Sequence, residues 1–328
     1  MITDIDVAIK VDREVIQKEE KPTVETIKEL FNLPFNDLIS KAHLVHNANF
    51  EPNTVQLSTL VNIKSGACPE DCSYCPQSIR YKTNVSKTSL MSVEDILDKA
   101  KKAKESGAGR FCMGAAWRSP KDKDLKVLLP VLRGIKDLGL ETCMTLGMLT
   151  ASQADKLKEA GLDYYNHNLD TSENYYKKII TTRTFDQRLE TIKNVQKSGM
   201  KVCCGGIIGL GETNYDRFEL LHVLSNMQPQ PESVPINTLV KVKGTPLQNE
   251  QDVDPIDLVK LIATARVIMP KTYIRLSAGR SSMSDELQAL CFFSGANSIF
   301  YGEELLTTEN PKINKDKLLM EKLGIISE

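Results

Sequence analysis

This chain of 328 residues has no excess of charge of either sign, because 42 Lys and Arg stand against 43 Asp and Glu. Proteins that bind nucleic acid or anionic membranes carry clustered basic residues, so we expect neither partner here. No apolar run approaches the roughly 18 residues of a membrane-spanning helix. The first residues, MITDIDVAIKVDREV, carry acids where a secretory signal peptide has basic residues. We therefore expect a cytoplasmic protein whose partners are small molecules or other proteins.

The sequence also lacks low-complexity segments and long linkers. Its composition, with 41% hydrophobic and 26% charged residues, is ordinary for a globular protein. Nothing therefore indicates a second domain separated by a linker. Residues 1–50 carry the amphipathic segment VETIKELFNL and are expected to be helical. We expect an N-terminal helical extension over 1–50, a barrel over 51–310 and a C-terminal tail over 311–328.

Eight β-branched or apolar runs alternate with amphipathic stretches, and each run is followed by a turn or helix-start signal. The runs are 57–68, 110–117, 140–147, 163–170, 201–210, 233–242, 272–279 and 298–308. Alternating strands and helices predict a parallel sheet covered by helices. Eight units over about 250 residues favour an α/β fold of the (β/α)8 TIM-barrel type over an open doubly wound sheet.

Three cysteines, Cys68, Cys72 and Cys75, lie within one short stretch, CPEDCSYC. In a reducing compartment, cysteines favour metal or redox chemistry over disulfides. Structural zinc sites use four protein ligands, and no fourth ligand lies nearby. A [4Fe–4S] cluster takes one ligand per iron, so three thiolates leave one iron open, as in a catalytic site. The stretch follows the first run directly, which predicts a position at the C-terminal mouth of the barrel, where barrel enzymes have their active sites.

Three further cysteines fall inside predicted strands. Alternation places Cys112 in the barrel interior and its bulky neighbours Phe111 and Met113 toward the helices. Cys143 lies in the next run, and in the doublet Cys203 and Cys204 the two side chains must face opposite ways, a choice that periodicity leaves open. Free cysteines are commonly core residues, so at this point a structural and a functional interpretation are about equally supported.

Polar residues also fall on the expected interior face. Arg275 is flanked by Ile274 and Leu276, and an arginine inside a barrel is costly unless it is compensated. Asn166, Asn168 and Asp170 recur at period two, and Asn237 could extend the same surface. These side chains predict a ligand with polar groups to hold.

The motif C-x3-C-x2-C, with Tyr74 before its last cysteine, is typical of the radical S-adenosylmethionine (SAM) superfamily. It is accompanied by the strings GAAWRSP, YNHNLDTS, GLGE, VPINTLVKVKGTPL, YIRLSAGR and GANSIFYGEELLTT. Residues from about 50 to 310 therefore resemble the biotin synthase family of that superfamily. The resemblance implies a sulfurtransferase that converts dethiobiotin to biotin.

The resemblance also implies the cofactors. A [4Fe–4S] cluster on Cys68, Cys72 and Cys75 would cleave SAM to a 5′-deoxyadenosyl radical. A [2Fe–2S] cluster would donate the sulfur. Its implied ligands are Cys112, Cys143, Cys203 and Arg275, which selects Cys203 from the doublet.

Contacts to SAM and substrate follow from the same resemblance. The implied SAM-binding residues are Tyr74, Gly114, Ala115, Ala116, Asn168, Asp170 and Arg188. The implied dethiobiotin-binding residues are Asn166, Asn237, Thr307 and Thr308. A flavodoxin or ferredoxin-type electron donor and a homodimer are the implied partners.

Two alternatives stay open from the sequence. One is another radical SAM enzyme of related architecture, such as a hydrogenase-maturation or lipoyl-forming relative; the compact N-terminal cysteine motif of the lipoyl-forming enzymes is absent here. The other is a non-catalytic iron–sulfur or zinc protein. The sequence does not identify the electron donor, the system that rebuilds the [2Fe–2S] cluster or the dimer interface. It also assigns no role to Cys204, Cys291 or Glu303.

Overall fold

The computed structural model of the chain describes residues 21–302 and 305–328. Residues 1–20 of the expected N-terminal extension, and Glu303, lie outside the described residues.

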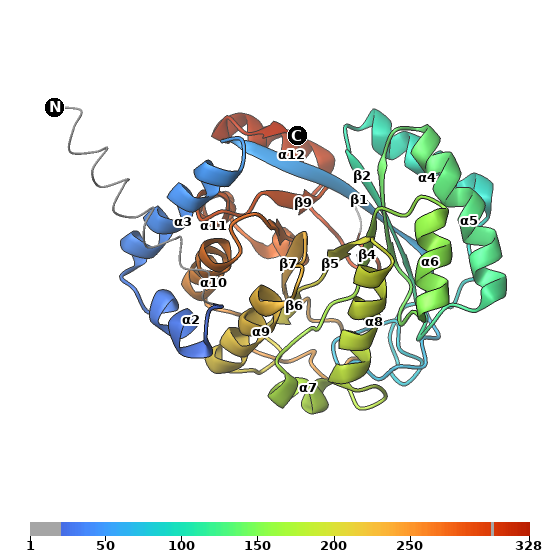
Figure 1. Cartoon of the computed structure of the whole chain (residues 1–328), viewed down its shortest axis with the longest axis horizontal. Helices are drawn as coiled ribbons and strands as arrows, with labels where there is room; N and C mark the ends of the chain where they lie inside the picture. The colour runs from blue at the N-terminus through green and yellow to red at the C-terminus, as the bar shows by residue number, and fades with distance from the viewer. Residues whose placement is uncertain (1–20, 303–304) are drawn as a thin grey trace.

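Eight parallel strands form a closed barrel at the centre of the molecule (Figure 1). They are β1 (Thr54–Lys64), β2 (Arg110–Ala115), β3 (Glu141–Thr145), β4 (Tyr164–Asn166), β5 (Lys201–Cys203), β7 (Ser233–Thr238), β8 (Tyr273–Leu276) and β9 (Ser298–Phe300). β9 pairs with β1, which closes the ring. A short strand, β6 (Gly206–Ile208), continues the run of β5 and pairs with β7. The predicted α/β barrel of TIM type is confirmed.

Eleven α-helices are present in the described residues, most of them surrounding the strands. They are α2 (Val24–Phe31), α3 (Phe35–Asn49), α4 (Val93–Glu105), α5 (Asp122–Asp137), α6 (Ala151–Glu159), α7 (Glu173–Ile179), α8 (Phe185–Lys197), α9 (Asn214–Asn226), α10 (Pro255–Ile268), α11 (Asp285–Phe293) and α12 (Ile313–Leu323). Many begin at a Ser or Thr whose hydroxyl accepts a backbone N–H of the first turn, as at Ser92 and Thr184. None of these described helices is both long and apolar enough to cross a bilayer.

Several predicted strands are shorter than expected. β4 ends at Asn166, although the N–H groups of His167 and Leu169 still donate to the carbonyls of Cys203 and Gly205. The chain then turns at Asp170, whose φ is +71°. The run 201–210 is divided into β5 and β6 at Cys204 and Gly205. A Cβ on Gly205 would lie 2.0 Å from the carbonyl oxygen of Pro235, so the backbone of β7 approaches closely there. The prediction of one continuous strand over 163–170, 201–210 or 298–308 was therefore wrong in extent.

Two separate sets of side chains are buried on the two faces of the strands. Phe111, Met113 and Cys204 pack into the large core between strands and helices. Inside the barrel a small cluster holds Cys112, Cys143, Tyr164 and Cys203, with Leu60 and Phe300 against it. The predicted alternation at Cys112 is confirmed, and the doublet is resolved with Cys203 inside the barrel.

Both ends of the described chain pack on the barrel. α2 contacts α9 through the rings of Phe31 and Phe218, whose centroids are 5.0 Å apart, and α3 lies against α10. At the other end, a short strand β10 (Ile326–Ser327) pairs with the start of β1. The predicted helical extension is present from residue 24, whereas the division of the chain at residues 50 and 310 stays a prediction.

We predict that His46 makes the protein less stable in mild acid. His46 on α3 is 6% exposed, and burial, followed by the charge of Arg266, lowers its pKa from 6.5 to about 4. The unfolded chain therefore takes up the proton first, and stability is lost as the pH falls from about 6.5 toward 4. From pH 7 to pH 5 the free energy of unfolding should fall by about 2 kcal/mol more in the unsubstituted protein than in His46→Phe. Urea denaturation at both pH values measures this, and equal pH dependence of the two proteins would contradict it.

Candidate active site

A cavity of about 310 Å³ opens at the C-terminal ends of the strands and extends into the barrel. Its lining includes most of the predicted site residues: Cys68, Cys72, Tyr74, Cys75, Cys112, Ala115, Ala116, Cys143, Asn166, Asn168, Asp170, Arg188, Asn237, Arg275, Thr307 and Thr308. Two predicted residues do not line it. Cys203 is fully buried behind the cavity wall, and Gly114 faces Leu306, whose side chain lies 2.3 Å from where a Cβ would be. The fold therefore brings together residues spread from 68 to 308.

The loop between β1 and α4, residues 65–91, carries the first three cysteines and is called the cluster loop here. It folds back on itself, so that the N–H of Cys68 donates to the carbonyl of Gln77 and the N–H of Ile79 donates to the carbonyl of Cys68, both at 2.9 Å. A further turn joins the N–H of Cys75 to the carbonyl of Cys72 at 2.9 Å. These bonds hold the three cysteines along one side of the cavity.

Two acidic side chains attach the cluster loop to the rest of the barrel mouth. Glu70 is buried and accepts a hydrogen bond from Nη1 of Arg118 at 2.8 Å and another from the hydroxyl of Thr182. Asp71 accepts the backbone N–H groups of Thr181 and Thr182 at 2.9 and 3.2 Å. Burial would raise the pKa of Asp71, but the bonds from Thr181 and Thr182 outweigh it and lower the pKa. Both carboxylates are therefore used within the protein to fix the loop.

Arg183 is a site residue that the sequence analysis missed. Its Nη2 lies 3.7 Å from Sγ of Cys72, and its Nε lies 3.7 Å from a carboxylate oxygen of Glu70. The side chain is 9% exposed, lines the cavity, and has a buried Nε without a hydrogen-bond partner among the described residues. No periodic pattern could have found it, because it follows α7 in a loop that only the folded barrel brings to Cys72.

The three thiols are in surroundings that disfavour their ionised form. Burial raises the pKa values of Cys68 and Cys72, and burial raises that of Cys75 to about 12. They will ionise readily only when a positively charged metal group is bound, as coordinating thiols do. Among residues 21–302 and 305–328, no group of three or more His, Cys, Asp or Glu side chains could hold a single metal ion. A cubane cluster takes each thiolate on a different iron, and the three thiols that line the cavity could supply three such ligands.

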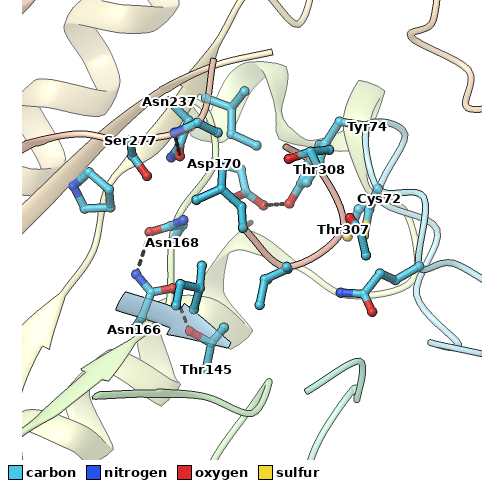
Figure 2. A pocket seen from close by; sticks show the side chains of 18 of the residues that line it. Cys72, Tyr74, Thr145, Asn166, Asn168, Asp170, Asn237, Ser277, Thr307 and Thr308 are labelled. Carbon is cyan, nitrogen blue, oxygen red and sulfur yellow. Dashed lines mark hydrogen bonds between the residues drawn. The ribbon is translucent and has the colours of Figure 1, made fainter. Parts of the chain in front are cut away.

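A buried polar network borders the cysteines. The hydroxyl of Tyr74 donates to Oδ2 of Asp170 at 2.6 Å (Figure 2). Nη2 of Arg188 donates to the same oxygen. Arg188 also donates to the carbonyl of Asn168 and, through Nε, to the hydroxyl of Tyr176 at 2.7 Å. Burial lowers the pKa of Arg188, but the carboxylate of Asp170 outweighs it and raises the pKa, so the guanidinium stays charged. Three of its five N–H groups are engaged in these bonds, which leaves two for a ligand.

The amides of the cavity wall are held by neighbours. Oδ1 of Asn166 accepts from the hydroxyl of Thr145 at 3.1 Å, and its Nδ2 reaches Oδ1 of Asn168 at 3.3 Å (Figure 2). Asn237 donates to the carbonyl of Gly206 at 2.9 Å and accepts from the N–H of Ala278 at 3.1 Å. Because both ends of each amide are occupied, their positions are fixed before a ligand arrives.

Thr307 and Thr308 come from the segment after β9. In Figure 2 they lie beside Tyr74 and Cys72, on the side of the cavity formed by the cluster loop. Nδ2 of Asn62, on β1, donates to the carbonyl of Leu306 at 2.7 Å and holds this segment against the barrel. Segments from the start and the end of the barrel therefore meet at one wall.

The remaining cysteines lie deep in the barrel. Cys112 and Cys143 are directly opposite each other on β2 and β3, and Nδ2 of Asn166 lies 3.2 Å from Sγ of Cys203. Burial would raise the pKa of Cys112, but a hydrogen bond from Cys143 and the charges of Arg275 and Arg110 lower it to about 7. The same hydrogen bond, together with burial, raises the pKa of Cys143, so the pair favours one thiolate and one thiol.

Arg275 is turned into the barrel, as predicted, and its side chain is held there by polar groups. Its Nε donates to the hydroxyl of Ser298 at 2.9 Å, and its Nη2 donates to the hydroxyl of Ser58 at 3.1 Å. The guanidinium also lies 4.7 Å from the centroid of the Phe300 ring. Ser58 shares the strand face of Leu60, so alternation along the first run could have identified it.

The comparisons with known proteins agree with this geometry. Residues 62–224 match the radical SAM superfamily, and residues 235–326 match the biotin and thiamin synthesis associated domain. Among solved structures, a methylornithine synthase superposes with a TM-score of 0.80 at 21% identity, covering 96% of both chains. The FeFe-hydrogenase maturase from Carboxydothermus hydrogenoformans gives 0.80 at 18% identity, covering 99% of this chain and 80% of its own. At such identities these two structures support the fold alone.

Sequence relatives are much more similar. The chain is 63% identical over 302 residues to a biotin synthase of Cellvibrio japonicus, covering 92% of this chain and 84% of the relative. It is 60% identical over 306 residues to one of Hahella chejuensis, covering 93% and 86%. A biotin synthase of Legionella pneumophila is 58% identical over 309 residues, covering 94% and 98%. With its barrel, its cysteine-lined cavity and these relatives, the chain belongs to the biotin synthase family of radical SAM enzymes.

Proposed function

We propose that this enzyme inserts sulfur between C6 and C9 of dethiobiotin, and that the reaction takes place in the cavity at the barrel mouth. The observation that carries the proposal is the presence of two separate cysteine sets along one cavity. Cys68, Cys72 and Cys75 lie at the mouth, and Cys112 and Cys143, with Cys203 behind them, lie at depth. Membership of the family implies SAM and an iron–sulfur cluster; the second, [2Fe–2S] cluster is part of the proposal.

The reaction explains why cofactors are required. The substrate carbons carry unactivated C–H bonds that no side-chain base can deprotonate, so the chemistry has to come from a cofactor. When bound, the [4Fe–4S] cluster with SAM supplies a primary radical that abstracts hydrogen, and the [2Fe–2S] cluster supplies sulfur. The tasks of the protein are to bind and orient SAM and dethiobiotin and to exclude solvent from the cavity.

The residues of the mouth would hold SAM. We assign Tyr74, Asn168 and Asp170 to its adenosine part, and the two free N–H groups of Arg188 to its carboxylate. Ala115 and Ala116, which line the cavity, would bound its methionyl end. Gly114 lies beneath Leu306 and would act through the close packing that it allows there. The bond between Tyr74 and Asp170 would keep this surface in place before SAM binds.

Amide and hydroxyl side chains would orient dethiobiotin between the two cysteine sets. Asn166 and Asn237 are placed to bind its ureido ring, and Thr307 and Thr308 to bind its carboxylate. The rigid attachment of both amides supports this role, because a radical abstracts any hydrogen within reach and selectivity has to come from position.

Arg275 would complete the set of Cys112, Cys143 and Cys203 as the fourth ligand of the second cluster. A protonated guanidinium has no lone pair to donate, so Arg275 would have to lose a proton to bind iron. It would then be a weaker ligand than a thiolate. A weak fourth ligand suits a cluster that has to give up a sulfide. The serine hydroxyls that hold Arg275 support a fixed position for this group.

Three further proposals concern the surroundings of the enzyme. We propose a cytoplasmic location, a homodimer, and a flavodoxin or ferredoxin-type protein as electron donor. Sedimentation of the reconstituted protein tests the dimer.

The activity is tested by anaerobic incubation of the reconstituted protein with dithionite, SAM and dethiobiotin. We expect biotin and 5′-deoxyadenosine, and about six irons per chain with labile sulfide. Formation of 5′-deoxyadenosine without biotin would support radical SAM chemistry but exclude dethiobiotin as the substrate. Zinc without labile sulfide would reject the cluster chemistry altogether.

The adjacent cysteines on β5 and after it provide a matched pair for the second cluster. We predict that Cys203→Ala loses about two irons per chain and all biotin formation but still cleaves SAM, because the mouth is unchanged. Cys204→Ala should retain both clusters, since its side chain packs into the outer core. Iron analysis and Mössbauer spectra of both variants measure this. Equal iron loss in the two variants would contradict the assignment.

Arg183 should raise the midpoint potential of the [4Fe–4S] cluster through its contact with Cys72. A donor N–H and a positive charge near a ligand sulfur stabilise the more negative, reduced state and raise the potential. We predict that Arg183→Gln lowers the midpoint potential by roughly 40 mV, equivalent to about 1 kcal/mol for one electron. In Arg183→Lys the midpoint potential should fall by much less, because the positive charge is retained. Redox titration followed by electron paramagnetic resonance distinguishes these outcomes, and an unchanged potential in Arg183→Gln would exclude this role.

A further inference from the structure

We propose that the outer face of the cluster loop is a docking surface for an acidic one-electron carrier protein. The surface consists of Ile79, Arg80, Lys82, Lys87 and Lys243, and is called the entry surface here. This inference rests on the proposed function, which requires electrons one at a time. It adds the place where they enter and the residues that the carrier would contact.

The entry surface lies directly behind the cysteines of the mouth. Cys68, Cys72 and Cys75 line the cavity from its inner side. Residues Gln77 to Ile79 run beside Cys68 on the other side of the loop, joined to it by two backbone hydrogen bonds of 2.9 Å. A carrier docked outside the loop would be separated from the cysteines only by this stretch of backbone.

Ile79 supplies an apolar centre for such a contact. Its side chain is 69% exposed, the largest value among the large hydrophobic residues of the described chain. Its backbone is nevertheless fixed, because its N–H donates to Cys68. A fixed, exposed apolar side chain surrounded by polar groups is the arrangement found at the centre of protein interfaces.

Positively charged residues follow Ile79 along the loop, with no acid in the same stretch of sequence. Arg80, Lys82 and Lys87 are all exposed, and the sequence from Cys72 to Val93 contains no Asp or Glu. Of the two acids that precede it, Glu70 is buried and paired with Arg118. Asp71, whose carbonyl accepts the hydroxyl of Tyr81, is hydrogen-bonded to Thr181 and Thr182 and is the one acid next to the surface in the sequence. On a chain with a net charge of −1, this is a local concentration of positive charge. It fits a partner with an acidic face.

The surface is also held rigidly from outside the loop. The turn at Gly244 packs against the carbonyl of Lys82, where a Cβ would lie 2.0 Å from the oxygen, and Gly244 has a φ of +91°. Lys243, which precedes Gly244 on this turn, is exposed. The hydroxyl of Thr83 donates to the carbonyl of Pro76 at 2.7 Å. The partner would therefore meet a preformed surface.

The electron balance of the contact is simple. One electron leaves the reduced carrier, which is oxidised by one electron, and enters the metal group held by the three cysteines. There it is consumed in the cleavage of one SAM to methionine and the 5′-deoxyadenosyl radical. No bond between carrier and enzyme forms or breaks.

The test compares two reductants on the full-length reconstituted enzyme under anaerobic conditions. One is an acidic flavodoxin kept reduced by its reductase, and the other is dithionite, which needs no docking surface. In Ile79→Glu and in the double variant Arg80→Glu/Lys82→Glu, we expect 5′-deoxyadenosine formation with flavodoxin to fall by about tenfold or more. With dithionite it should stay within about twofold of the unsubstituted enzyme. The flavodoxin-driven rate of the unsubstituted enzyme should also fall with added salt.

Matched controls lie on α12, away from the mouth. Leu318 is 61% exposed, and Lys315 and Lys317 beside it are exposed. Leu318→Glu replaces an exposed apolar side chain by an acid, and Lys315→Glu/Lys317→Glu reverses two positive charges, as the entry-surface variants do. Both controls should leave the flavodoxin-driven and dithionite-driven rates unchanged. Binding of oxidised flavodoxin, measured by calorimetry, should weaken only in the variants of the entry surface and gives a readout independent of turnover.

The outcomes separate this inference from the proposed function. Flavodoxin binding and flavodoxin-driven rates that are unchanged in Arg80→Glu/Lys82→Glu would overturn the entry surface. A dimer that dissociates in the same variants while flavodoxin binding is unchanged would overturn it in favour of a second copy of this chain. If the unsubstituted enzyme forms no 5′-deoxyadenosine with either reductant, it is the proposed function that fails.

Discussion

Closure of the barrel between β9 and β1 is the interaction on which the site depends. Ser298 and Gln56 are opposite each other in this pairing, as are Phe300 and Ser58. Arg275 donates to Ser298 on one strand and to Ser58 on the other, so its guanidinium spans the closing pair. Without this closure, the segment with Thr307 and Thr308 would not meet the cluster loop, and the deep cysteines would not be enclosed.

Enclosing so many polar groups is costly, and the structure compensates the cost locally. Breaking a buried ion pair by removing one partner typically costs about 3 to 5 kcal/mol. Asp170 and Arg188 are each only about 3% exposed and are bonded to each other and to Tyr74. The hydrogen bonds that offset the cost of burying these charges also fix the orientation of the side chains. The same contacts therefore serve both folding and ligand binding at this wall.

Periodicity predicted the architecture and part of the lining, whereas Tyr74, Ala115, Ala116, Arg188, Thr307 and Thr308 were expected only from the resemblance to the family. Alternation placed Cys112 inside and Phe111 outside, and both placements agree with the structure. Asn168 and Asp170 line the cavity as expected, although they do so from a turn that follows β4 and not from a strand. Arg183 could not be predicted, because its approach to Cys72 depends on how two loops from different parts of the chain are placed. Local pattern identifies faces of elements, whereas contacts between loops require the folded barrel.

The cluster loop also shows how one segment can meet two opposed requirements. A radical reaction needs walls that exclude solvent and other hydrogen donors, whereas a reductant has to approach from outside. An electron can pass through a few residues of packed backbone, but a solvent molecule cannot. Because the cysteines point inward and Ile79 points outward from adjacent stretches of the same loop, the enclosed site and the external surface are kept apart by the loop itself. The hydrogen bonds between Cys68 and residues 77 to 79 therefore belong to the wall of the cavity and also join its inner cysteine to the exposed Ile79.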